Sequence, residues 1–310
     1  MVLATVLLGV QQGLTWSMTQ TSQLDLTRPD QRGVTIGLNE FAGYAGVALG
    51  GLGTAYLAGG MDPRQALLLF GLTVAALALL DLRRVQDTLP WAQQEAARQG
   101  GGESGSLGTR QVFWRMSWGD RRLAALSQAG LVEKFVDALV WVFYPVFLYG
   151  AGLSLPEVGW VTGVYGVVWG VSQLLTGRLS DRVGRQWPNV LGMWVCGLGV
   201  ALMLLGTGLA WWSFAAAVSG LGMALLYPNL SAAVADLAHP SWRGSAIGIY
   251  RFWRDLGYSV GALGLGLTAS VTGQLAPAFW FVAGAMFLSG LVLLVWGEES
   301  HPRLRAASGE

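Results

Sequence analysis

Nine stretches of this chain are mostly apolar over about 20 residues or more, the length at which a helix crosses the hydrocarbon core of a bilayer. Of its 310 residues only 12% are charged, against about 25% in an average soluble domain, so it cannot supply a soluble fold's polar shell. The sequence therefore predicts an all-α integral membrane protein. The stretches cover residues 2–24, 34–58, 65–82, 123–150, 158–176, 188–209, 211–235, 246–271 and 277–296.

Several functional classes are excluded by what the sequence lacks. A formal net charge of +1 gives no electrostatic case for a nucleic-acid partner. Cys196 is the single cysteine, so there is no internal disulfide, and we expect no metal site and no cofactor. The sequence contains no phosphate-binding loop for ATP and no arrangement typical of an intramembrane enzyme.

Basic residues alternate between the connections, and this alternation predicts the orientation in the membrane. The first, third, fifth and seventh connections and the C-terminal tail are rich in arginine, whereas Arg64 is the only basic residue in the others. Because positively charged loops stay in the cytoplasm, we expect the arginine-rich side and the C-terminus to be cytoplasmic. Arginine replaces lysine almost throughout, which favours a bacterial inner membrane.

An internal repeat relates two parts of the chain. Shifting the sequence by 211 residues aligns residues 25–53 with 236–264, and 12 of these 29 positions are identical. Parallel repeats of this kind are typical of transporters built from two similar halves. The matched pairs include Asp25 with Asp236 and Arg32 with Arg243.

The repeat also predicts the domain organisation. We expect residues 1–84 to be the remainder of an N-terminal half with three helices, 85–121 a flexible cytoplasmic linker, 122–297 a six-helix C-terminal half and 298–310 a cytoplasmic tail. Since Met1 aligns with Trp212, about 90 residues, or three helices, are expected before Met1. The alternative is an inactive remnant, if Met1 is the true start.

The segment 177–186 reads Gly-Arg-Leu-Ser-Asp-Arg-Val-Gly-Arg-Gln and follows the fifth stretch. It resembles the G-x-L-x-D-R-x-G-R-[RK] signature of the major facilitator superfamily at every defined position except Gln186. The resemblance implies a two-bundle helical fold, of which nine of twelve transmembrane helices are present, and alternating access without enzymatic activity. The signature residues are Gly177, Arg178, Asp181, Arg182, Gly184 and Arg185.

In this family the loop closes the cytoplasmic side in one state. Glycines allow its tight turn, and Asp181 can sit against the N-terminus of a helix in the opposite half. We expect its partner near residues 33–37, at the start of the second stretch. The alternative is a basic loop that only fixes the topology.

Three ionisable residues lie inside the fourth stretch: Glu133, Lys134 and Asp137. A charge in mid-bilayer costs about 3 kcal/mol or more, so such residues face a cavity and pair with each other. Spacings of three and four place them within reach, and Lys134 with Asp137 could form a pair that a proton switches. The alternative is a static pair that sets helix packing.

The eighth stretch carries Arg251, Arg254 and Asp255. Arg251 lies about 9 Å into its helix at 1.5 Å per residue, and Glu40 occupies the equivalent position of the repeat. This exchange of sign suggests an inter-half gate pair between Glu40 and Arg251, with Asp255 a further coupling or substrate candidate. Alternatively, both arginines extend to the cytoplasmic surface.

Glycines at three- and four-residue spacing, among them Gly46, Gly50, Gly257 and Gly261, predict close helix packing. Aromatic residues could line a substrate cavity or belong to the interfacial belt: Trp141, Phe143, Tyr144, Trp160, Tyr165, Trp169, Tyr227 and Trp253.

We therefore expect a transporter that exchanges protons for a small amphipathic organic compound and exports it, an antiporter surrounded by lipid. The alternative is proton-coupled import of an organic anion paired with Arg251 or Lys134. The sequence leaves the substrate, the coupling ion and the oligomeric state open.

Overall fold

The computed structural model describes residues 2–98 and 107–304, and all regular structure in these ranges is helical. The chain folds into α1 (Val2–Leu26), α2 (Arg32–Gly60), α3 (Pro63–Asp81), α4 (Leu89–Arg98), α5 (Thr109–Trp114), α6 (Arg121–Ala138), α7 (Tyr144–Gly150), α8 (Leu155–Val183), α9 (Gln186–Leu205), α10 (Leu209–Leu237), α11 (Arg243–Thr272) and α12 (Ala276–Trp296). Short 3₁₀- and π-helical turns lie at Pro29–Gln31, Arg115–Gly119 and Leu139–Phe143.

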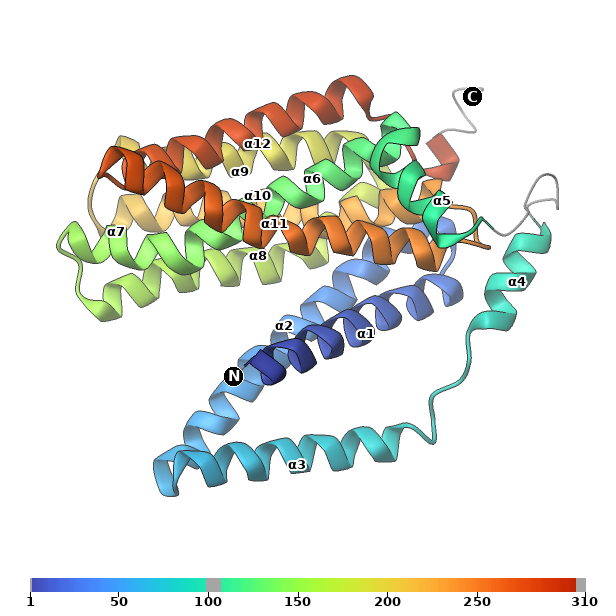
Figure 1. Ribbon diagram of the computed structural model, residues 1–310, viewed down its shortest axis with the longest axis horizontal. Coiled ribbons are helices and arrows are strands. Elements are labelled where there is room, and N and C mark those ends of the chain that lie inside the picture. The colour runs from blue at the N-terminus through green and yellow to red at the C-terminus, as the bar shows by residue number, and fades with distance from the viewer. Residues whose placement is uncertain (1, 99–106, 305–310) are drawn as a thin grey trace.

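The helices form two groups (Figure 1). α6 to α12 pack side by side in one bundle, with α10 held between α8 and α9 and with α11 lying along α6. α1 to α3 form the second group, which meets the bundle where α2 crosses α8 and where α1 contacts α11. α5 lies against the end of α11, and α4 lies at the same end of the molecule, where it contacts α1 (Figure 1).

Local sequence signals explain where these helices begin and end. Asp62 accepts hydrogen bonds from the backbone amides of Arg64 and Gln65, so it caps α3, whose first residue is a proline. Glu157 accepts from the Ser154 amide and hydroxyl at the start of α8. Gly184 ends α8 with a φ of 99°, a conformation that side-chain-bearing residues rarely adopt.

Glycines let the helices of the C-terminal bundle approach closely. A Cβ atom on Gly257 would lie 2.1 Å from the Leu131 carbonyl oxygen of α6, and one on Gly261 would lie 2.8 Å from Phe135. Gly50 makes only ordinary contact with Phe70. The packing prediction is wrong for Gly46, because no described atom lies within 4 Å of its added Cβ.

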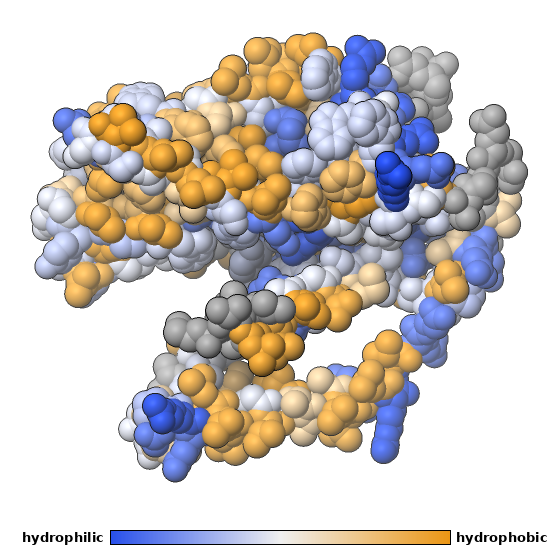
Figure 2. All heavy atoms as spheres, in the orientation of Figure 1, coloured by the Kyte–Doolittle hydropathy of each residue, from blue (hydrophilic) through white to orange (hydrophobic). Residues whose placement is uncertain are grey.

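Each of the nine apolar stretches is mostly helical in the described residues. Six helices there are long and apolar enough to cross a membrane by length and composition. The others, α1, the α6–α7 segment and α11, carry amide or charged side chains within their apolar sequence. Stretch 123–150 is also interrupted by a π-helical turn at Leu139–Phe143. The outer surface remains apolar, as orange residues over α3, α11 and α12 show in Figure 2, which suits contact with lipid.

The region expected to be a flexible linker contains helical structure in its described part. α4 and α5 fall inside residues 85–121, whereas 99–106 lie outside the described residues. α4 contacts α1, and α5 contacts α11, so the two ends of this region pack on different groups of helices.

Candidate functional site

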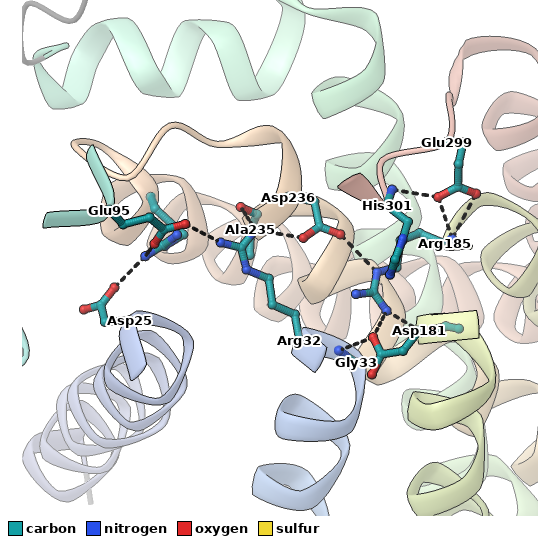
Figure 3. Close-up of polar contacts among 12 residues, drawn as sticks. Asp25, Arg32, Gly33, Glu95, Asp181, Arg185, Ala235, Asp236, Glu299 and His301 are labelled. Atoms are coloured by element: carbon teal, nitrogen blue, oxygen red, sulfur yellow. Dashed lines mark hydrogen bonds and ion pairs between the residues drawn. The ribbon is translucent and has the colours of Figure 1, made fainter. Parts of the chain in front are cut away.

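Asp181 links the two groups of helices where α8 ends and α2 begins. Its carboxylate oxygens accept hydrogen bonds from the Gly33 and Val34 amides, both at 2.9 Å. These amides belong to the first turn of α2, which has no carbonyl partners within the helix for its N–H groups. The carboxylate therefore satisfies two backbone donors that lack a partner within the helix, and its negative charge interacts favourably with the positive end of the helix dipole (Figure 3). This contact lies at the position expected from the sequence.

α2 and α8 meet through backbone atoms at this point. A Cβ atom on Gly33 would lie 2.6 Å from the Gly177 carbonyl oxygen, and one on Gly177 would lie 2.4 Å from that of Gly33. Gly177 thus serves helix packing, while the turn that the sequence analysis assigned to the glycines is made by Gly184. Most of the signature forms the last turns of α8 rather than a loop.

Two ion pairs cross between the groups beside this contact. Arg32 on α2 donates to Asp236 at the end of α10 at 2.8 Å, and Arg243 at the start of α11 donates to Asp25 on α1, also at 2.8 Å. The repeat aligns Asp25 with Asp236 and Arg32 with Arg243, so each group of helices supplies one cation and one anion. We call these two ion pairs the exchanged pairs. Both arginines are buried, and breaking a buried pair costs about 3–5 kcal/mol, so this end of the molecule is held closed.

Glu95 of α4 joins the two exchanged pairs. Its carboxylate lies 3.0 Å from the Arg32 guanidinium and 2.8 Å from that of Arg243 (Figure 3). The segment predicted as a plain connector therefore contributes a charge that contacts both halves of the repeat.

Arg185 donates hydrogen bonds to three carboxylates at this end of the molecule. Its guanidinium donates to Asp181 at 2.6 Å and to Asp236 at 3.0 Å, while its backbone amide donates to Glu299 of the tail (Figure 3). His301 follows in the same tail and is buried. Burial, together with the positive charge of Arg185, lowers the pKa of His301. By contrast, Arg178 and Arg182 are exposed.

A second cluster surrounds Lys134 in the interior. The Lys134 ammonium lies 2.6 Å from Asp137 and 3.1 Å from Glu133, and all three side chains are almost fully buried. Tyr165 donates to Oδ1 of Asp137 at 2.7 Å. Tyr258 donates at 3.1 Å to Oδ2, the oxygen that also contacts Lys134. One carboxylate thus accepts hydrogen bonds from two hydroxyl groups and from the ammonium.

Aromatic rings enclose the Lys134 ammonium on its other sides. Its Nζ atom lies 4.6 Å from the Tyr227 ring centre, 5.3 Å from that of Tyr258 and 5.5 Å from that of Trp169. Such contacts attract a cation electrostatically. Trp169, Tyr165 and Tyr227 are buried here, whereas Trp141 and Trp160 are exposed on the outer surface.

The structure does not bring Glu40 and Arg251 into an ion pair. Glu40 accepts hydrogen bonds from Trp16 at 2.8 Å and from Gln20 at 3.4 Å. Arg251 lies 3.6 Å from Asp255, whose side chain is 46% exposed. Arg254 donates to the Tyr227 hydroxyl and stacks over its ring. Neither arginine extends to the surface, since Arg251 is 5% and Arg254 3% exposed.

Sequence reasoning did not assign a role to the residues of the exchanged pairs or to Glu95 and Glu299. The repeat already matched Asp25 with Asp236 and Arg32 with Arg243, and this recurrence was the available signal. Glu95 and Glu299 lie in polar segments, where nothing in the pattern indicated a partner. Among the described residues, no cluster of three or more His, Cys, Asp or Glu side chains could hold a metal ion.

Comparison with known proteins gives relatives that match parts of this chain. The fosmidomycin resistance protein of Escherichia coli strain K12 is 26% identical over 164 residues, which cover 53% of this chain and 40% of that protein. Multidrug resistance protein MdtH of Yersinia pestis strain Pestoides F is 31% identical over 155 residues, 46% of this chain and 38% of that protein. Each alignment thus spans less than half of the relative's length.

A solved structure has the same fold. The proton:xylose symporter XylE bound to 6-bromo-6-deoxy-D-glucose superposes with a TM-score of 0.67 at 17% sequence identity, covering 96% of this chain and 72% of that one. Residues 126–310 match the family model described as Major Facilitator Superfamily. Members of that family are multi-pass membrane transporters rather than enzymes. The chain belongs to the major facilitator superfamily.

Proposed function

We propose that the chain works as a secondary transporter that exports a small amphipathic organic compound in exchange for protons. The observation that carries the proposal is the Lys134–Asp137 pair, buried at 2.6 Å and surrounded by aromatic rings. A buried ion pair is costly to build and sensitive to the loss of either charge. A residue pair of this kind inside a membrane helix is typical of proton pathways.

The coupling step follows from the geometry of the pair. When Asp137 takes up a proton on its carboxylate, the ion pair with Lys134 is lost, while Lys134 keeps Glu133 at 3.1 Å as its remaining anion. Tyr165 and Tyr258 then face a neutral acid instead of a carboxylate, so their hydrogen bonds weaken. The three helices that carry these groups, α6, α8 and α11, are thereby released from one shared anion.

The closed end supports alternating access. In the proposed orientation the exchanged pairs and the Asp181 contact seal the cytoplasmic side of a bacterial inner membrane. The three helices of residues 1–84 and the six-helix half of residues 122–297 rock against each other, with residues 85–121 joining them and 298–310 as the tail. Breaking the seal lets the binding region face the cytoplasm, where an exported compound is loaded.

Two relatives bear names that refer to resistance, to fosmidomycin and to multiple drugs. Resistance by a membrane transporter of this family agrees with export, so these names support the direction of the proposed transport.

The proposal is tested by proton movement in sealed vesicles. Proteoliposomes that contain the full chain and an internal pH dye receive fosmidomycin on one side. We expect the compound to drive proton movement in the opposite direction, and Asp137→Asn to abolish it, because the amide cannot take up a proton. Asp81→Asn is the matched control, since Asp81 is exposed at the end of α3. Unchanged proton movement in Asp137→Asn would contradict the proposal.

A further inference from the structure

Arg251 and Arg254 differ from the other buried arginines in the distance to their anions. Arg32, Arg185 and Arg243 each have a carboxylate oxygen at 3.0 Å or less. The nearest carboxylate to Arg251 and Arg254 is that of Asp255, at 3.6 Å and 4.0 Å, and it is nearly half exposed.

The two side chains also carry unused hydrogen-bond donors. The Nε and Nη1 atoms of both Arg251 and Arg254 are buried and have no hydrogen-bond partner in the described structure. The same two atoms of Arg243 are also unpartnered, but the guanidinium group of Arg243 has two carboxylates at 2.8 Å. A buried charged donor without an acceptor costs far more than an exposed one. Two such guanidinium groups close together indicate a place where a hydrogen-bond acceptor from a bound molecule can contact both.

Their placement gives a shared face between the halves. A spacing of three residues puts both on one side of α11, about 12 and 16 Å from its first residue at 1.5 Å per residue. Arg251 lies over the Trp16 ring of α1 at 5.8 Å, and Arg254 lies over the Tyr227 ring of α10 at 4.0 Å. The guanidinium groups therefore face both groups of helices.

Three aromatic rings lie in a row between the two arginines. The Trp16 and Tyr44 ring centres lie 6.0 Å apart, and those of Tyr44 and Tyr227 lie 6.3 Å apart. The rings thus run in an arc from one arginine to the other. Guanidinium groups bind carboxylate, phosphate and phosphonate through paired N–H donors, and ring faces bind flat apolar groups.

We propose that Arg251 and Arg254 bind the anionic group of the transported compound, an organic anion whose apolar part packs against Trp16, Tyr44 and Tyr227. This deepens the proposed function, on which it rests for the act of transport. Glu40, which is buried and bound to Trp16, also interacts electrostatically with Arg254 and Arg251, so a bound anion shares the two arginines with this carboxylate.

The test is a binding measurement without any gradient, on the full chain in detergent. Three probes of matched shape are used: benzylphosphonate, benzylammonium and benzyl alcohol. Binding is measured by thermal stabilisation and by tryptophan fluorescence. We expect benzylphosphonate to bind and the other two to bind at least about tenfold more weakly, because only the phosphonate supplies acceptors for charged donors. Equal binding of all three, binding of none, or preference for benzylammonium would overturn the proposal.

Variants assign the binding to the two arginines. Arg251→Gln and Arg254→Gln should each weaken benzylphosphonate binding about tenfold or more, whereas Arg84→Gln, at an exposed position, should leave it unchanged. If either glutamine variant fails to fold, the three-probe comparison on the unaltered chain decides alone. If benzylphosphonate binds but fosmidomycin moves no protons, the proposed function is rejected and the anion site stands. If fosmidomycin moves protons but the three probes bind equally, the anion site is rejected and the proposed function stands.

Discussion

The Arg32 guanidinium donates to the Asp236 carboxylate at 2.8 Å, across 204 residues of chain, and Arg243 repeats this contact with Asp25. Each pair joins one group of helices to the other. Together with the Asp181 contact to the first turn of α2, they close the arginine-rich end of the molecule.

We predict that Arg32→Gln opens this end. The substitution breaks the buried Arg32–Asp236 pair and leaves Asp236 with Arg185 alone, and breaking a buried pair costs about 3–5 kcal/mol. Spin labels at Arg28 and Trp187, exposed on opposite sides of the contact, should report a longer mean distance than in the unaltered chain. Asp236→Asn added to Arg32→Gln should reverse part of the change, and an unaltered distance in the single variant would contradict the prediction.

Glu95→Gln should weaken the same closure from the linker. Glu95 contacts Arg32 and Arg243 at once, and its side chain is one-fifth exposed, so solvent screens the interaction. We therefore expect a smaller opening than in Arg32→Gln, detected with the same spin labels. Glu298→Gln serves as a control, because Glu298 is exposed and pairs with Arg122. A larger effect from Glu298 than from Glu95 would refute this role of the linker.

Alanine at Gly33 or Gly177 should destabilise the fold. The added Cβ atoms would lie 2.6 and 2.4 Å from backbone oxygens of the facing helix, which cannot move aside as a flexible side chain can. Overpacking of this kind costs about 1–3 kcal/mol, so the melting temperature in detergent should fall. Gly51→Ala is the matched control within α2, since its Cβ meets open space and alanine favours a helix. Equal melting temperatures for both changes would contradict the packing argument.

Stability should fall as the pH drops below about 6.5, the ordinary pKa of histidine. His301 is buried, and its pKa in the folded chain is lowered, so the unfolded chain binds a proton at a pH where the folded chain does not. Acidification therefore favours unfolding. Between about pH 5 and 7, a range around that ordinary value, the melting temperature of His301→Asn should depend less steeply on pH than that of the unaltered chain. An identical slope in both proteins would show that His301 does not contribute.

Much of the architecture was predictable because membrane helices must be long and apolar. The family, the helical character and the position of the Asp181 partner all follow from hydrophobic length, one signature and one repeat. Of the nine apolar stretches, six give helices of the described residues that are long and apolar enough to span a membrane, since Glu133, Lys134 and Arg251 lower the hydropathy of the helices that carry them.

The candidate site was predicted only in part. Local spacing correctly brought Lys134 beside Asp137, because residues three apart on a helix face the same side. The Glu40–Arg251 pair failed as a contact, since equivalent positions in a repeat need not face each other: Glu40 turns to Trp16 on α1 instead. Contacts made by the linker and tail depend on tertiary docking, which composition does not encode, as Glu95 and Glu299 show.

The exchange of Asp25 and Arg32 with their repeat counterparts has a consequence for how such a chain could arise. Each half offers one donor and one acceptor in the same order, so the surface is self-complementary, like the isologous face of a homodimer. Two copies of a single ancestral half would already have matched charges at this interface, before any fusion into one chain. Glu95, by contrast, lies on the segment that connects the halves, so its contact with both pairs depends on that connection.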